Sequence, residues 1–337
     1  MKRQLLNSIA LAICVCSSVL FACQAPVFRY ALERWIPGTW KIIVLSDGPL
    51  SPEQTDSLLK LQHSVMPNIA RNSPLIGLQH IDLVSAAPAD RRRWESFRNA
   101  IGSDGTPVVA ALYPQPSTVD QPVASLRKLS ATTSEQIFTS PVRSELASRL
   151  SAGHSAVWLF LESGNTQADQ DAIERLSSQL KNDEQRLRLP TATDLQITPE
   201  QLRQLRIPLK LQFSVISLRR DDPREQFLVD SLLSSEADLG ELAEPMAFPV
   251  FGRGRVLYAL VGSGIVAKTI SDASDFLAGP CSCQVKEQNP GFDLLLVHDW
   301  SKSIGDTLVS SPVPEERKSP SLIQIPPGRG STSKPKN

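Results

Sequence analysis

Short apolar runs alternate along this chain with longer segments whose apolar residues recur every three or four positions. The clearest apolar runs cover residues 40–46, 156–161 and 211–218. Unbroken runs of this length are typical of strands buried on both faces, whereas the spacing of three or four is typical of amphipathic helices. The pattern predicts an α/β fold with mixed, mostly parallel sheets covered by helices.

Helix start signals follow these runs. After the first run, Ser51 and Pro52 supply an N-cap and a proline at the first helical position, and Gln54 completes a capping box. After the third run, Asp222 and Pro223 repeat the cap and the proline. Each apolar run is therefore predicted to lead through a turn into a helix.

The remaining elements occur in the same order in both halves of the chain. In the first half we expect a strand over 75–85, a helix over 90–101 and a proline-led strand over 106–112. In the second half, strands over 248–251 and 256–261 are joined by a glycine-rich turn and followed by a helix. A repeated order of this kind predicts two modules of similar construction.

This element order resembles that of thioredoxin-like modules. The resemblance covers most of residues 154–279 and, less completely, 40–153, where the final hairpin is not clear from the pattern. It implies two tandem thioredoxin-like modules, at 40–153 and 154–310. In that family a cis-proline borders the active site, and Pro107 and Pro249 are the prolines that match it.

The catalytic motif of that family is missing from both halves. Thioredoxin-like enzymes carry Cys-x-x-Cys where the first helix begins, and the corresponding loops here, 47–51 and 162–166, contain no cysteine. The resemblance therefore implies the fold without conventional thioredoxin activity.

Residues 1–22 have the pattern of a secretory signal peptide. Lys2 and Arg3 form a positive start, an apolar stretch follows over about 9–21, and Ala22 is a small residue before the cleavage point. The apolar stretch is short for a membrane span, which needs roughly 20 residues. We therefore expect an extracytoplasmic protein, either periplasmic or secreted.

Cys23 has two interpretations. Residues 20–23 resemble the lipobox of bacterial lipoproteins, which implies a lipid on Cys23 and a membrane-anchored protein. Without lipid, Cys23 is available for a disulfide. An amphipathic helix is predicted directly behind it, within 23–39, in either case. The apolar positions that predict this helix are Phe28, Ala31, Leu32 and Trp35.

The charges of the chain are balanced. Among 337 residues there are 35 Lys and Arg and 35 Asp and Glu, so removal of the signal peptide leaves a net charge near −2. Since no basic field is present, we expect no nucleic-acid partner, and membrane contact only through a lipid on Cys23. Residues 311–337 are rich in Pro, Ser, Lys and Gly and predict a disordered tail.

Three cysteines remain after signal removal, namely Cys23, Cys281 and Cys283. An oxidising compartment favours a structural disulfide between Cys23 and one of the other two. Alternatively, Cys281 and Cys283 form a reducible redox pair, or bind Cu(I) or Zn(II) with a third ligand from Cys23 or a histidine. Inert thiols are the remaining interpretation. The four histidines show no metal-ligand spacing, and His298 beside Asp299 is most simply a satisfied surface pair.

These features favour a non-catalytic role. The leading hypothesis is an exported envelope protein that binds or assembles with another envelope protein, without a cofactor. The alternative is a thiol–disulfide or metal-handling protein that uses Cys281 and Cys283, with Cu or Zn as cofactor. The segments 23–35, 248–255 and 279–290 also resemble a family of secreted bacterial proteins without assigned function, which implies export.

Overall fold

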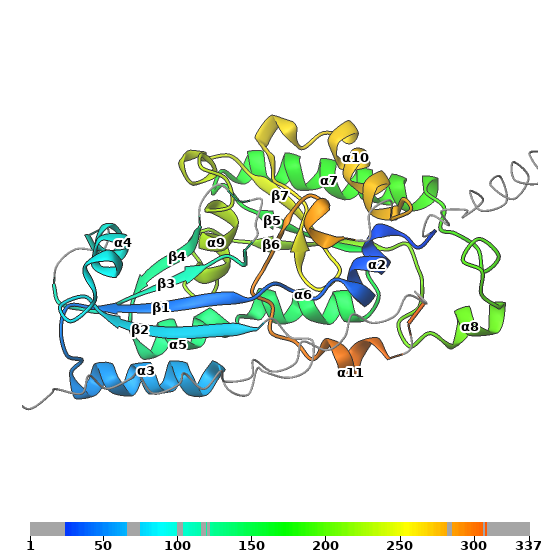
Figure 1. The fold of residues 1–337 in the computed structure, drawn as a ribbon. Coiled ribbons are helices and arrows are strands. Elements are labelled where there is room, and N and C mark those ends of the chain that lie inside the picture. Colours follow the sequence, from blue (N-terminus) through cyan, green and yellow to red (C-terminus); the bar gives the residue numbers. More distant parts are fainter. Residues whose placement is uncertain are drawn as a thin grey trace, which may run out of the picture.

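The computed structural model describes residues 24–308 apart from a few internal gaps. The gaps are residues 66–74, 100–103, 116–118, 120–121, 282–284 and 306. Two sheets with helices packed on their faces give a mixed α/β fold (Figure 1). The predicted signal peptide, Cys23, Cys283 and the predicted tail at 311–337 lie outside the described residues.

The first sheet has four strands in the order β2-β1-β3-β4. Its strands are β1 (Trp40–Ser46), β2 (Ile76–Asp82), β3 (Val108–Leu112) and β4 (Val123–Lys128). β1 and β2 are parallel, whereas β3 is antiparallel to both of its neighbours. The β3–β4 hairpin is the part of the first half that the sequence pattern did not reveal.

Helices cover both faces of this sheet. They are α3 (Pro52–Val65), α4 (Pro88–Asn99) and α5 (Ala131–Phe138). Ile42 of β1 belongs to the same core as Leu61 of α3, and α5 lies beside α3. Ile43 points to the opposite face, where it packs in a separate core with Trp94 of α4. Successive β1 side chains are therefore buried on alternate faces, as a pleated strand between two helical layers requires.

The second sheet has six strands, five of them in the order β10-β8-β7-β5-β6, with β9 pairing β7 beside this path. Its strands are β5 (Ala156–Leu161), β6 (Phe213–Leu218), β7 (Met246–Phe251), β8 (Arg255–Val256), β9 (Leu260–Val261) and β10 (Phe292–Asp293). β5 and β6 are parallel, and the other pairings are antiparallel. The bounds of β1 and β5 match the predicted runs, whereas the strand predicted over 256–261 is broken between β8 and β9.

The helices of the second half also form two layers. They are α2 (Val27–Arg34), α6 (Pro141–Ser151), α7 (Thr166–Arg186), α9 (Gln226–Leu233) and α10 (Ala267–Ala278), with the short α8 (Pro199–Gln204) and α11 (Trp300–Ile304) outside them. Trp158 of β5 packs in one core with residues of α2, α7 and α10. Leu159 packs on the other face with residues of α6 and α9. Within the described ranges, no helix has the length and apolar character needed to cross a membrane.

The prediction of mostly parallel sheets is wrong. Among the described strand pairings only β1–β2 and β5–β6 are parallel, and the others are antiparallel. The unbroken apolar runs indicated burial on both faces, which the helical layers provide whatever the direction of the strands. The apolar pattern therefore indicates that a strand is buried, but it does not determine whether neighbouring strands are parallel or antiparallel.

The capping predictions had different outcomes. Gln54 N–H donates to Ser51 Oγ at 3.2 Å, and Ser51 N–H donates to Gln54 Oε1 at 2.8 Å, so the predicted capping box is confirmed. Asp222 does not cap a helix, because its carboxylate accepts hydrogen bonds from the backbone and the guanidinium of Arg224. α9 begins later, at Gln226.

The N-terminal helix α2 is buried on nearly every side rather than on one face. It packs against β7 and α10 and encloses an ion pair in which Arg29 Nε lies 2.6 Å from Glu33 Oε1, with side chains 1% and 0% exposed. Leu308 N–H also donates to Glu33 Oε1, at 2.9 Å. The predicted helix is therefore present, and the last described residues of the chain contact it through Leu308.

Asp293 of β10 fixes the connection between α2 and β1. Its Oδ2 accepts hydrogen bonds from Gly38 N–H and Lys286 Nζ, both at 2.7 Å, and its Oδ1 lies 3.2 Å from Arg255 Nη1. A Cβ at Gly38 would come within 2.3 Å of Pro114, so the close approach of these segments requires glycine.

The two sheets are joined through the contact of β4 with α9. Asp230 accepts hydrogen bonds at 2.7 Å from Ser125 Oγ and from Nε and Nη2 of Arg127. The hydroxyl of Tyr113 donates to the carbonyl oxygen of Ser231. A single apolar core continues across this contact, from β1 and β3 to β5 and β7.

Candidate functional site

Of the three cysteines predicted to matter, Cys281 lies within the described residues. It is buried directly after α10, and its backbone N–H donates to the carbonyl oxygen of Ala25 at 3.0 Å. Cys23 and Cys283 lie outside the described residues. Among the residues that are described, no group of three or more His, Cys, Asp or Glu is arranged to hold a metal ion. The predictions of a redox pair and of a Cu or Zn site remain untested.

The two candidate prolines occupy different positions. Pro107 directly precedes β3, and its carbonyl oxygen accepts from Leu129 N–H at 2.7 Å. Pro249 lies inside β7, opposite Trp158 of β5, and does not begin the strand. Pro245 directly precedes β7, in the position that Pro107 has before β3. The apolar pattern did not point to Pro245, because it predicted a strand that begins at Phe248.

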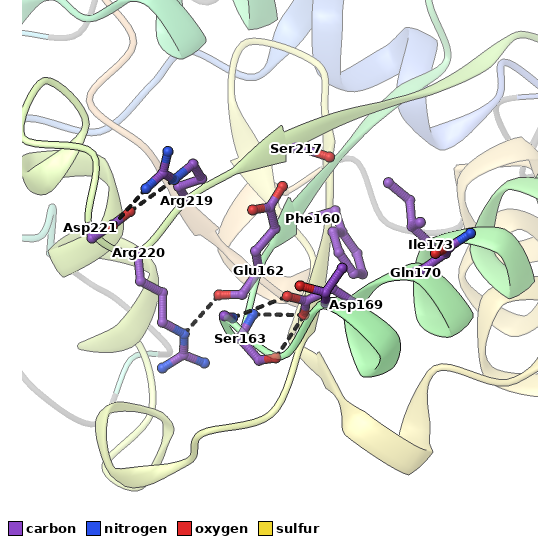
Figure 2. A pocket seen from close by; sticks show the side chains of 12 residues that line it. Phe160, Glu162, Ser163, Asp169, Gln170, Ile173, Ser217, Arg219, Arg220 and Asp221 are labelled. Atoms are coloured by element: carbon purple, nitrogen blue, oxygen red, sulfur yellow. Dashed lines mark hydrogen bonds and ion pairs between the residues drawn. The ribbon is translucent and has the colours of Figure 1, made fainter.

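The main pocket described in the structure opens where β5 and β6 end. It has a volume of about 660 Å³ and lies beside the first turns of α7 (Figure 2). The carboxyl ends of parallel strands are a common position for ligand sites, because the loops diverge there. The loop 162–166 forms part of the wall.

This loop is held by Asp169 in the first turn of α7. One carboxylate oxygen of Asp169 accepts from both the backbone N–H and the hydroxyl of Ser163 at 2.8 Å, and the other accepts from Gly164 N–H at 3.1 Å. Asn165 caps the helix through a 3.2 Å hydrogen bond from Ala168 N–H. The N–H groups of Ser163, Gly164 and Ala168 are thus bonded within the protein.

Arg220 ties the pocket wall to the segment before β7. Its guanidinium donates to the carbonyl oxygens of Glu162, Leu242 and Glu244, at 3.1, 2.9 and 2.8 Å. Partial burial lowers the pKa of this guanidinium from its usual value. Arg220 therefore connects the end of β5 to the residue directly before Pro245, and its hydrogen bonds serve the structure.

Arg219 is engaged by Asp221 on the outer edge of the pocket. Two parallel hydrogen bonds, of 3.0 Å from Nε and 2.8 Å from Nη2, join the guanidinium to the carboxylate. These bonds raise the pKa of Arg219 and lower the pKa of Asp221. Because the side chains are 66% and 71% exposed, this pair is solvated and can rearrange.

Glu162 has a different environment. Among the described residues, no hydrogen bond or ion pair engages its carboxylate. Figure 2 shows this carboxylate directed toward the side of the pocket where Phe160 and Ser217 lie. Ile173 and Gln170 of α7 lie beyond Phe160 on that same side, and Arg219 lies on the other side of Glu162. The pocket thus combines a carboxylate without a hydrogen-bond partner with apolar, neutral polar and guanidinium groups.

A smaller polar cluster lies in the first sheet, at the end of β1 and beside β2. Ser46 Oγ donates to the carbonyl oxygen of Gly48 at 2.9 Å and lies 2.9 Å from His80 Nε2. The serine proton is committed to the carbonyl, so His80 is the donor in the second bond. This arrangement is opposite to that of a histidine that activates a nucleophilic serine.

His298 is not paired with Asp299. Its Nε2 lies 2.8 Å from Ser303 Oγ, and Asp299 instead caps α11 by accepting from Lys302 N–H at 3.0 Å. Burial lowers the pKa of His298. The two neighbours share no hydrogen bond, but the Asp299 carboxylate opposes the effect of burial by raising the pKa of His298 electrostatically.

No family model matches this chain. No curated protein is similar to it in sequence either. The fold and the pocket define an α/β protein with a polar pocket at the strand ends of its second sheet.

Proposed function

We propose that this chain is an exported, non-catalytic binding protein built from two thioredoxin-like modules. The repeated topology supports two copies of one module, because the orders β2-β1-β3-β4 and β6-β5-β7-β8 have the same strand directions. A proline directly before β3 and before β7 adds to this similarity. The signal-like residues 1–22 support export to the periplasm or beyond.

The pocket beside α7 is the observation that carries the binding function. It lies at the loop where the thioredoxin-like family places its thiols, and its walls here are formed by carboxylate, guanidinium, hydroxyl and apolar groups. Its rim is held rigidly by Asp169 and Arg220, and a preformed pocket with a few polar groups suits recognition of a ligand. The partner we propose is another envelope protein, which would place a side chain in this pocket.

The attachment of the N-terminus fits this role in either processed form. α2 begins at Val27 and is buried at once, so a lipid on Cys23 would hold the body close to the membrane surface. The competing function, thiol–disulfide exchange or metal handling by Cys281 and Cys283, is favoured by one observation: the Cys281 backbone is bound to Ala25, two residues from Cys23.

Site-specific photo-crosslinking in the native cell envelope tests the proposal. A photoreactive residue at Ser217, in the pocket, is expected to give a discrete protein adduct, and the same residue at the exposed Ser178 of α7 is expected to give none. Absence of an adduct from position 217, or equal adducts from both positions, would contradict a binding role for the pocket. The adduct should persist in a Cys283→Ser variant, and its loss from a folded variant would favour the thiol function.

A further inference from the structure

We infer that the pocket recognises a cationic side chain of the lysine class, presented by the partner. This inference rests on the proposed binding function and specifies its ligand chemistry. It follows from which charges of the pocket are already engaged within the protein and which one is not.

Both arginines of the pocket have partners within the protein, and the exposed pair of Arg219 with Asp221 is the one that can rearrange. Arg219 is held by two hydrogen bonds to Asp221, and Arg220 is held by three backbone carbonyl oxygens. An anionic ligand would have to displace these bonds. It would also meet the carboxylate of Glu162 in the same pocket.

The start of α7 offers an anion little more. The N–H groups of Ser163 and Gly164 donate to Asp169, and Ala168 N–H donates to Asn165. These bonds satisfy donors that a phosphate or carboxylate would otherwise use at a helix start. The helix start therefore offers an anion fewer free donors than an uncapped helix would.

Glu162 gives the pocket its preference for a cation. Its side chain is half-buried, and among the described residues no hydrogen bond or ion pair engages its carboxylate, which attracts the Arg219 guanidinium only through the longer-range electrostatic interaction. Ser217 and Gln170 line the same pocket and add oxygen acceptors; Gln170 directs its amide N–H₂ to Glu174 at 3.1 Å, which leaves its carbonyl oxygen. An ammonium group has three donors and no acceptor, so it matches a carboxylate, a hydroxyl and an amide oxygen.

The apolar walls select for a long aliphatic stem. Phe160 and Ile173 line the pocket beside Glu162, and lysine buries its methylene groups along such surfaces while its charged end meets polar atoms. A volume of about 660 Å³ leaves room for such a side chain together with neighbouring backbone and water. The pocket thus places apolar side chains beside an acidic group.

The test is an NMR titration of the ¹⁵N-labelled full-length mature protein with three capped tripeptides. Acetyl-Gly-Lys-Gly-amide is expected to shift the amide signals of Glu162, Ser217 and Ile173. The norleucine peptide, which keeps the stem without the charge, and the glutamate peptide are expected to bind at least about tenfold more weakly, since one charged hydrogen bond changes affinity by that order.

Two variants with opposite expected effects separate recognition from a change in fold. Glu162→Gln keeps the shape of the side chain and is expected to weaken the lysine peptide about tenfold or more. Arg219→Gln removes a pocket cation that attracts the Glu162 carboxylate and is expected to strengthen that peptide. A general loss of structure would weaken binding in both variants.

The outcomes also distinguish a failure of the cationic-ligand inference from a failure of the proposed binding function. Tighter binding of the glutamate peptide, or equal binding of lysine and norleucine peptides, would overturn the cationic ligand while leaving the pocket as a binding site. Absence of binding by all three peptides would overturn the inference too. The proposed function then stands or fails on the crosslink from Ser217.

Discussion

The backbone N–H of Cys281 donates a 3.0 Å hydrogen bond to the carbonyl oxygen of Ala25. A second bond of 3.0 Å, from Val27 N–H to the Gly279 carbonyl, makes this a short antiparallel bridge centred on Pro26 and Pro280. The start of α2 is therefore paired with the end of α10. The first segment of the described structure is thereby anchored to the second sheet and its helices.

We predict a disulfide between Cys23 and Cys283 in the mature, oxidised protein. Each of these cysteines is two positions beyond the bonded pair Ala25 and Cys281 along the chain. Non-reducing peptide mapping by mass spectrometry should show the linked peptides, and Cys283→Ser should lower the free energy of unfolding by about 2–4 kcal/mol. A lipid found on Cys23, or a bridge from Cys281 to Cys283, would contradict this pairing.

Removal of Glu33 should strongly destabilise the protein. Glu33→Leu leaves the Arg29 guanidinium buried without its carboxylate, and loss of one partner of a buried ion pair costs about 3–5 kcal/mol. The double variant Arg29→Met with Glu33→Leu should recover most of this free energy. Asp272→Ala is the matched control, because it breaks the exposed pair with Lys268 and should cost less than about 1 kcal/mol. Equal losses in Glu33→Leu and the control, measured by urea unfolding, would refute the argument.

The contact between the two sheets should depend on Asp230. Asp230→Asn removes the charge that receives three hydrogen bonds from Ser125 and Arg127, and we expect the free energy of unfolding to fall by about 1–3 kcal/mol. Glu200→Gln, in an exposed pair with Arg203 on α8, should change it by less than about 0.5 kcal/mol. If the two variants unfold at the same urea concentration, Asp230 does not join the sheets.

Stability should decrease as the pH falls below about 6.5. Burial lowers the pKa of His154 and His298, with Lys210 and Arg149 adding to the effect at His154 while Glu145 and Asp299 oppose it. The unfolded chain then binds protons more readily than the folded protein. The two histidines therefore contribute their full share to the free energy of unfolding above pH 6.5, and this share is lost as the pH falls through their lower pKa values in the folded protein.

Urea unfolding at pH 7.5 and pH 5.5 measures this effect. Hydrogen bonds from Arg224 lower the pKa of Asp222 to about 2, so that group contributes only at more acidic pH. The double variant His154→Gln with His298→Gln should lose the difference between the two pH values. An unchanged difference in that variant would assign the effect to other groups.

Gly38→Ala should destabilise the connection between α2 and β1. The added Cβ would come within 2.3 Å of the Pro114 ring, and such overpacking costs about 1–3 kcal/mol. Gly240→Ala has no atom within 4 Å of the added Cβ and serves as the control. Thermal unfolding should separate the two variants, and similar midpoints would show that the segment at Gly38 adjusts without cost.

The local elements were predictable to a large extent. The strands at Trp40–Ser46 and Ala156–Leu161 have their predicted bounds, and Ser51 and Gln54 form the predicted capping box. Both features depend on residues close together in the sequence. The helix start predicted at Asp222 failed because a neighbouring side chain, Arg224, competes for the carboxylate.

The candidate site was only partly predictable. The loop 162–166 was identified, but as a catalytic loop without its thiols, and the pocket beside it was not foreseen. Arg219 and Arg220 gave no signal because isolated arginines after a strand are common on surfaces. Pro245 was missed because the apolar pattern placed the start of β7 too late.

The amino-acid sequence by itself determined the order of strands and helices, since periodicity, caps and turns act over a few residues. Only the tertiary structure decided the antiparallel pairing in both sheets, the burial of Arg29 and Glu33, and the meeting of Glu162 with Ser217 in one pocket. These features depend on contacts between segments far apart in the chain, whose free energies of packing and desolvation are set by the fold as a whole.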